Sequence, residues 1–306
     1  TATGIAMGTV IRQSIYTKDD DVTKDVEHII LELEQKELSW RIKDSEIAGI
    51  NASAGSGEGM ILSKELGEDL TTIFEVSAAS NGAFDCSIGS VVRLWNIDEW
   101  AAGENMDLVL PQKEAVEQSL INIGYEKIKI ENGVLSLPAL MSIDIGAVGK
   151  GIACDRVATY LQEQNVDGAV ISVGGSILTF GKKPDGTPWQ VGIVDPRDSE
   201  QLLGTLYLEG NWFVSTSGDY ERYVEVDGVR YHHILDPATG YPVNNGVRSV
   251  TIVCKSGLLS DALSTACFVL GVEKGMKLAE KYEAEALFVD DLGITYMTDG
   301  MKEIFY

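Results

Sequence analysis

The chain has 306 residues, of which 44% are hydrophobic, so it is long enough for one large or two ordinary domains with a proper core. It carries 24 basic and 47 acidic side chains, and the net charge of -23 argues against nucleic acid or an anionic membrane surface as a partner. A phosphate ligand would therefore need a local Lys, a helix N-terminus or a divalent cation to reverse the sign of the charge.

The cysteines show no C-x-x-C spacing and lie among apolar or small residues, so we interpret them as small buried residues rather than a disulfide or zinc site (Cys86, Cys154, Cys254 and Cys267). No run of about 18 apolar residues is present, so no membrane-spanning helix is expected. The chain begins at Thr1 rather than Met, and we expect any signal peptide or lipid anchor to have been removed ahead of it.

The first half of the chain alternates helix patterns with short strands. In order, the pattern predicts a strand over 9–16, an acidic helix over 20–38, a short helix from Glu46 capped by Ser45, a helix over 63–80, a loop or short helix over 94–105, a helix over 111–121 and a hairpin about Asn132-Gly133. Residues 141–145 then read as a strand that leads through a glycine turn into a helix from Gly151.

Strands dominate the second half. The pattern predicts strands over 169–173, 177–180, 189–194, 204–209 and 212–217, a hairpin about Asp227-Gly228, a strand over 247–254, a helix over 259–270, and a final helix and strands over 272–282, 286–290 and 294–297. Runs of strands with helices appended, without strict βαβ alternation, favour an α+β fold.

The turn between residues 144 and 151 is the first candidate site. A strand-to-helix turn exposes backbone N–H groups and carbonyls to a ligand, and Lys150 adds a cationic donor at the mouth of the helix. The alternative is that Asp144 and Lys150 only cap and solvate an ordinary turn.

Asp261 and Thr265 form the second candidate site. Their i, i+4 spacing places a carboxylate and a hydroxyl on one side of a helix, a pair of oxygen ligands that suits magnesium. Alternatively, Thr265 bonds a carbonyl of its own helix and Asp261 only interacts with the helix dipole.

A loop rich in glycine and proline carries the third candidate, His233, beside Asp236 and Thr239. Histidines on rigid loops are good candidates for general acid–base catalysis, although a surface histidine is the plain alternative and His232 lies next to it. Gly174-Gly175, after a predicted strand, indicates either close approach of a ligand or an ordinary turn.

Taken together, these segments resemble the ApbE family, the flavin transferases that move FMN from FAD to a threonine or serine of a protein. The resemblance covers nearly the whole chain in order: Met7-Gly8-Thr9, Ser45-Glu46-Ile47 with Asn51, Gly82-Ala83-Phe84-Asp85, residues 144–151, Ser172-Val173-Gly174-Gly175, residues 215–222, residues 233–240 and residues 261–266.

The resemblance implies roles for particular residues. Magnesium would be held by the carbonyl of Ala147 with Asp261 and Thr265, and His233 would be the catalytic residue. The FAD site would be formed by Met7, Arg41, Ala83, Phe84, Asp85, Asp144, Lys150, Gly174, Leu235 and Thr239.

Three positions depart from the family pattern. Arg41 stands where many relatives have an aromatic residue, with Trp40 shifted by one, so position 41 offers no ring for stacking. Ser176 replaces a frequent Asn or Asp, and Cys86 replaces a hydroxyl or small residue.

The sequence therefore predicts an ApbE-like, T-fold-like α+β protein with mixed sheets and packed helices. Residues 1–306 would form one flavin transferase unit, or two lobes with the FAD cleft between them. The expected activity is magnesium-dependent transfer of FMN from FAD to a hydroxyl of an acceptor protein, with release of AMP. The alternatives are an FAD pyrophosphatase and a non-catalytic FAD-binding protein. We expect an extracytoplasmic location with an N-terminal lipid anchor.

Overall fold

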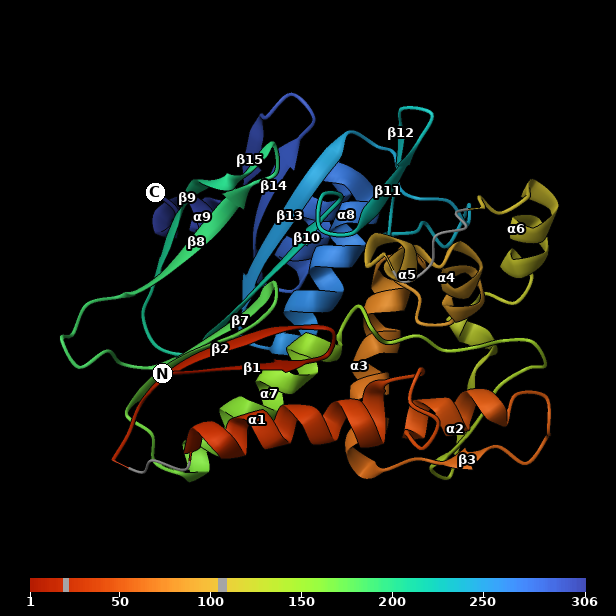
Figure 1. The fold of residues 1–306 in the computed structure, drawn as a ribbon, viewed down its shortest axis with the longest axis horizontal. Helices are drawn as coiled ribbons and strands as arrows, with labels where there is room; N and C mark the ends of the chain where they lie inside the picture. The colour runs from red at the N-terminus through yellow and green to blue at the C-terminus, as the bar shows by residue number, and fades with distance from the viewer. Residues whose placement is uncertain (19–21, 104–108) are drawn as a thin grey trace.

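The computed structural model describes residues 1–18, 22–103 and 109–306. Its centre is an eight-stranded sheet in the spatial order β1-β2-β6-β7-β10-β13-β14-β15 (Figure 1). Neighbouring strands pair in the antiparallel sense, and a parallel pairing occurs at the isolated bridge between Ile88 and Ser142. The sheet strands are β1 (Ala2–Ala6), β2 (Thr9–Tyr16), β6 (Gly168–Val173), β7 (Ser176–Gly181), β10 (Trp212–Gly218), β13 (Val247–Cys254), β14 (Glu285–Asp290) and β15 (Thr295–Met297).

The remaining strands form small separate sheets. These are β3 (Met60–Ile61), β5 (Val134–Ser136) and β4 (Lys129–Glu131); β8 (Trp189–Asp195) with β9 (Asp198–Leu208); and β11 (Tyr223–Val226) with β12 (Val229–His232). The helices are α1 (Val22–Leu33), which continues into a π-helical turn (Glu34–Leu38), α2 (Glu46–Ala52), α3 (Lys64–Ala79), α4 (Gly89–Trp95), α5 (Ile97–Ala101), α6 (Lys113–Leu120), a 3-10 turn (Tyr125–Lys127), α7 (Gly149–Glu163), α8 (Gly257–Lys281) and α9 (Asp299–Ile304).

Both faces of the central sheet are covered. Successive side chains of a strand point to opposite faces, and β10 shows the result. Phe213 packs in the cluster that contains Val157 of α7, whereas Val214 packs with Trp189 of the β8–β9 hairpin and Met301 of α9. The sheet is thus a scaffold with α1, α7 and α8 on one face and the β8–β9 hairpin with α9 on the other (Figure 1).

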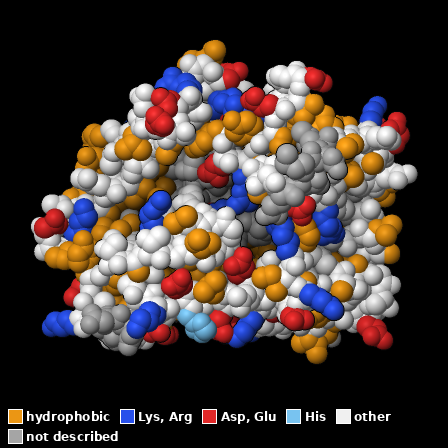
Figure 2. All heavy atoms as spheres, in the orientation of Figure 1, with side chains coloured by type: hydrophobic (Ala, Val, Ile, Leu, Met, Phe, Trp, Pro, Cys, Tyr) orange, Lys and Arg blue, Asp and Glu red, His pale blue; other side chains and the backbone are white. Residues whose placement is uncertain are grey.

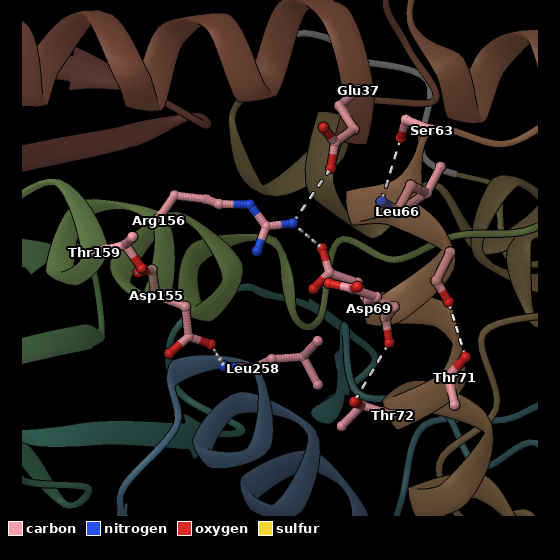
Figure 3. Close-up of polar contacts among 12 residues, drawn as sticks. Glu37, Ser63, Leu66, Asp69, Thr71, Thr72, Asp155, Arg156, Thr159 and Leu258 are labelled. Atoms are coloured by element: carbon pink, nitrogen blue, oxygen red, sulfur yellow. Dashed lines mark hydrogen bonds and ion pairs between the residues drawn. The ribbon is translucent and has the colours of Figure 1, made fainter.

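Helices α7 and α8 meet at their N-terminal ends. A Cβ atom on Gly151 would collide with the carbonyl oxygen of Gly257, so the close crossing requires glycine. The carboxylate of Asp155 accepts hydrogen bonds from the Gly257 N–H at 2.7 Å and the Leu258 N–H at 2.8 Å, and the second of these is drawn in Figure 3. Asp155 therefore caps α8 from α7 and fixes the two helix starts against each other.

A second polar cluster joins α7 to α3 and to the π-helical turn (Figure 3). Arg156 Nη2 lies 2.6 Å from Asp69 Oδ2 and 3.9 Å from Glu37 Oε1. Burial raises the pKa of Glu37 to about 7, and the nearby Arg156 opposes this increase. One arginine thus pairs with a buried carboxylate, Asp69, and a half-buried one, Glu37.

The α+β class predicted from the sequence is confirmed, and most predicted elements are present. The Ser45 side chain caps α2, accepting from the Ala48 N–H at 3.0 Å, and both predicted hairpins form. The helices predicted over 259–270 and 272–282 are parts of α8, which is interrupted at Gly271 with φ 76°. The predicted ranges 20–38 and 94–105 lie partly outside the described residues, at 20–21 and 104–105.

The strand predicted over 141–145 is wrong. This segment makes one isolated bridge instead of joining a sheet, because a side chain and a neighbouring turn satisfy its backbone. The Asn51 amide accepts from the Ile143 N–H at 2.7 Å and donates to the Ile143 carbonyl at 2.9 Å, while the Asp144 N–H donates to the Cys86 carbonyl at 2.7 Å. The helix that follows begins at Gly149, two residues before the predicted start.

None of the helices within the described ranges is both long enough and apolar enough to cross a membrane.

Candidate active site

The turn between residues 144 and 151 is held rigidly at the centre of the candidate site. The Asp144 carboxylate accepts a hydrogen bond from the Gly146 N–H at 2.8 Å, which shapes the turn. Burial raises the pKa of Asp144, and the Gly146 hydrogen bond and Arg41 oppose this change. The turn ends where α7 begins, so Lys150 stands in the first turn of that helix.

Asp261 joins this turn to the rest of the site. The residue is 4% exposed, and its carboxylate accepts hydrogen bonds from the Gly151 N–H at 2.6 Å and from the Ser176 hydroxyl at 2.7 Å. Helix α8, the start of α7 and the turn after Gly174-Gly175 therefore meet at one carboxylate. Ser176, one of the departures from the family pattern, takes part here as a hydrogen-bond donor to Asp261.

The residues predicted to bind magnesium offer oxygen atoms of the kind that this ion prefers. Each Asp261 oxygen keeps a lone pair beyond its single hydrogen bond. The Thr265 hydroxyl lies 3.4 Å from the Ser217 hydroxyl, and no hydrogen bond to its own helix is formed within the described residues. Ala147 is exposed. Nowhere in the described ranges do three or more His, Cys, Asp or Glu side chains form a group able to hold a metal. Asp261, Thr265 and Ala147 instead offer a carboxylate, a hydroxyl and a backbone carbonyl.

The two neighbouring histidines have different surroundings. His232 is buried with both ring nitrogens engaged, by the Val243 carbonyl at 2.8 Å and the Ile234 N–H at 3.2 Å. In His233, Nδ1 lies 3.2 Å from the Arg222 carbonyl, and the His233 N–H donates to the same oxygen at 3.1 Å. A carbonyl only accepts, so Nδ1 carries the proton and the Nε2 lone pair of the neutral ring remains available.

Electrostatics keep His233 neutral near physiological pH. Burial lowers its pKa to about 4, Asp98 opposes this decrease, and Arg222, His232 and Lys150 add to it. The charges that act on His233, in the loop after β12, therefore include that of Lys150 at the start of α7.

Arg41 contacts an aromatic ring and a carboxylate. Its guanidinium lies 4.3 Å from the centroid of the Trp40 ring, and the Arg93 guanidinium lies 5.2 Å from the same ring. Arg41 Nη2 also lies 3.1 Å from Asp98 Oδ2, and Arg222 Nη1 lies 3.2 Å from Asp98 Oδ1. Several cations therefore gather in one part of a chain whose net charge is strongly negative.

Glu221 belongs to the site although the sequence analysis gave it no role. A Cβ atom on Gly175 would lie 3.3 Å from Glu221 Oε1, so this carboxylate sits against the glycine turn. The residue is exposed to solvent, yet crowding by protein atoms raises its pKa. Lys150 and Arg222 oppose this increase, and Asp261 adds to it. A signal existed in the sequence, because Glu221 stands next to Arg222 in a segment that matches the family.

Other predicted FAD contacts have side chains occupied by the protein itself. The Asp85 carboxylate accepts from the Ser87 N–H and hydroxyl and from the Tyr125 N–H, at 2.7 to 3.0 Å. The Thr239 hydroxyl donates to Asp236 at 3.3 Å. Phe84 and Leu235 are buried. The 82–86 turn is still close to the centre, since the Cys86 carbonyl holds the backbone of Asp144.

Two predicted contacts lie at the tips of neighbouring hairpins of the central sheet. Met7 and Gly174 have positive φ angles of 53° and 57°. A Cβ atom on Gly174 would lie 2.8 Å from the Thr9 hydroxyl, so the two turns touch and leave backbone groups at the end of the sheet. Figure 2 shows that the face drawn in Figure 1 is hollowed near its middle, with Lys, Arg, Asp and Glu side chains around the hollow. The fold and the site together define an α+β protein with a polar, cation-containing site at the end of an antiparallel sheet.

Comparisons with known proteins agree with this description. The model of the ApbE family matches residues 7–288. An FAD:protein FMN transferase of Vibrio cholerae is 32% identical over 98% of this chain and 88% of its own length, and one of Treponema pallidum is 34% identical over 93% and 83%. The crystal structure of the ApbE protein of Thermotoga maritima superposes with a TM-score of 0.87 at 30% identity, covering 99% of this chain and 98% of that one. The flavin transferase ApbE of Vibrio cholerae gives the same TM-score, identity and coverage. The chain belongs to the ApbE family.

Proposed function

We propose that this protein transfers FMN from FAD to a threonine or serine hydroxyl of an acceptor protein and releases AMP. The observation that carries the proposal is the convergence of the 144–151 turn, the Asp261 helix and the His233 loop, in a chain that matches FAD:protein FMN transferases over nearly its whole length. Asp261 contacts Gly151 and Ser176, Glu221 lies against Gly175, and the carbonyl of the next residue, Arg222, holds His233. In this reaction the hydroxyl oxygen bonds to the FMN-side phosphorus of FAD, and the bond from that phosphorus to the AMP phosphate breaks.

His233 would accept the proton from the attacking hydroxyl. Its neutral ring presents the Nε2 lone pair because Nδ1 donates to the Arg222 carbonyl. Lys150, at the start of α7, would place a positive charge beside the diphosphate, and the positive end of the helix dipole would add to it. The gathering of Arg41, Arg93 and Arg222 supplies further positive charge for an anionic substrate.

Ala147, Asp261 and Thr265 would hold the magnesium ion in this proposal. When bound, the ion would supply positive charge to the diphosphate oxygens. Asp261 is suited to this role because it is anchored by two hydrogen bonds and keeps lone pairs on both oxygens. Asp261→Ala should abolish magnesium binding measured by calorimetry, together with magnesium-dependent transfer, whereas Glu273→Gln, at an exposed position of α8, should change neither.

One incubation tests the function as a whole. FAD, magnesium and the protein are combined with and without an acceptor domain, and the products are separated. Flavinylated acceptor supports transfer, free FMN with AMP indicates a pyrophosphatase that uses water as acceptor, and unchanged FAD indicates a binding protein. Each of the last two outcomes would contradict the proposal.

The role of His233 has its own test. His233→Ala should slow transfer by about 10²- to 10⁴-fold, the usual contribution of general-base catalysis, and should leave FAD binding largely intact. His28→Ala is the matched control, because that histidine lies exposed on α1. Full activity in His233→Ala combined with loss in His232→Ala would move the base by one residue, and full activity in both variants would refute base catalysis by this loop.

We also propose an extracytoplasmic location with an N-terminal lipid anchor. The resemblance to the ApbE family supports this proposal. Fractionation of cells that produce the natural precursor would test it, and recovery of the protein in the cytoplasmic fraction would contradict it.

A further inference from the structure

Asp98 has no role in the proposed reaction, yet its carboxylate joins two segments of the site. It lies in the short helix α5, and its two oxygens contact different arginines. Oδ2 accepts from Arg41 Nη2 at 3.1 Å and Oδ1 accepts from Arg222 Nη1 at 3.2 Å. These partners lie 57 and 124 residues away in the sequence, so the bridge is a product of the tertiary fold.

One of these arginines also fixes the proposed base. The Arg222 carbonyl oxygen accepts from the His233 N–H at 3.1 Å and lies 3.2 Å from His233 Nδ1. Arg222 is therefore held at both ends. Its guanidinium contacts Asp98, and its backbone carbonyl contacts the His233 imidazole. Movement of Arg222 would remove the acceptor that keeps the proton on Nδ1.

The charges around His233 point to the same role. Although burial acts to raise the pKa of Asp98, Arg222, His233 and Arg41 lower it, so the carboxylate stays ionised. Among the charged groups that act on His233, Arg222, His232 and Lys150 oppose its protonation, and Asp98 favours it. Asp98 is thus the counter-charge through which His233 could hold a proton that it had accepted.

We propose that Asp98 is a positioning residue that holds His233 in place through Arg222. In this position His233 donates its Nδ1–H to the Arg222 carbonyl and leaves Nε2 for the acceptor hydroxyl. This inference rests on the proposed function, in which His233 is the base. Asp98 contributes by orientation and charge, without contact with the reacting atoms.

The test uses Asp98→Asn in the full chain. Nitrogen-15 spectra of the histidine rings report which ring nitrogen carries the proton, and the chain has only three histidines to assign. In the unmodified protein we expect the Nδ1–H form of His233, and in Asp98→Asn a shift toward the Nε2–H form. Transfer should fall by about 10²-fold in kcat, the effect expected when a reacting group is misplaced.

The neighbouring residue provides the matched control. Glu99→Gln removes a charge from the same helix, where Glu99 contacts Asn96 at 2.7 Å and neither arginine, and it should leave the ring spectrum and kcat unchanged. Arg222→Gln should reproduce the effect of Asp98→Asn, and combining the two changes should add little.

Two results would overturn the inference. One is an unchanged His233 tautomer in Asp98→Asn, whatever the activity, since Asp98 would then act elsewhere, for instance through Arg41. The other is a changed tautomer with full kcat. Failure of the proposed function is distinguishable from both, because it would appear as free FMN with AMP, or as unchanged FAD, when the unmodified protein is incubated with the acceptor domain, whereas the spectrum tests Asp98 without any turnover.

Discussion

Replacing Glu37 with Gln should remove a pH-dependent part of the stability of the fold. Glu37 lies half-buried beside Arg156 (Figure 3), and its side chain is 17% exposed. Asp69, Glu46 and Glu65 also act on it. Burial raises its pKa from 4.5 to about 7. A group with a raised pKa binds its proton more tightly in the folded state, so its contribution is complete below pH 4.5 and is lost as the pH rises through 7.

The size of the effect follows from the shift. A difference of about 2.5 between the two pKa values, at ~1.36 kcal/mol per unit, makes ~3 kcal/mol an upper value for the change. Gln carries no charge at any pH, so the difference in unfolding free energy between the variant and the unmodified protein should change by up to ~3 kcal/mol between pH 4 and pH 8. The variant should gain relative stability at the higher pH.

Urea unfolding at several pH values measures this difference. Glu114→Gln is the control, since Glu114 is an exposed carboxylate in the first turn of α6, is not among the groups that act on Glu37, and its replacement should give a nearly constant difference. A constant difference for Glu37→Gln across the same pH range would refute the reasoning, because it would show that the Glu37 carboxyl binds protons equally in the folded and unfolded chain.

Two further predictions concern the cap of α8 and the candidate site. Asp155→Ala removes the acceptor for two N–H groups at the start of α8 and for the Ser256 hydroxyl, so the free energy of unfolding should fall by about 3 kcal/mol. Urea denaturation measures this change, and an unchanged midpoint would contradict the capping role of Asp155. Glu221→Gln removes an exposed negative charge close to Lys150, so FAD should bind roughly tenfold more tightly by fluorescence titration, and weaker binding would show that the carboxylate contacts the substrate favourably.

Local chemistry determined the elements that the sequence predicted correctly. The hairpin about Asn132-Gly133 forms because both residues adopt positive φ, 52° and 76°, which Asn and Gly tolerate. Ser45 caps α2 because its hydroxyl reaches an N–H three residues ahead. The order of the family motifs likewise fixed the fold class and the list of candidate residues, since both are properties of the chain itself.

Contacts between distant segments decided the rest. Residues 141–145 have a strand pattern, but Asn51 and the 82–86 turn provide the hydrogen-bond partners of their backbone. These partners are distant in the sequence, so the local pattern of residues 141–145 does not indicate them. The sequence could not distinguish His232 from His233, because the difference lies in which carbonyl each ring meets after folding. The Asp98 bridge is likewise created by tertiary packing, since the geometry of a polar group becomes defined only when its long-range neighbours are in place.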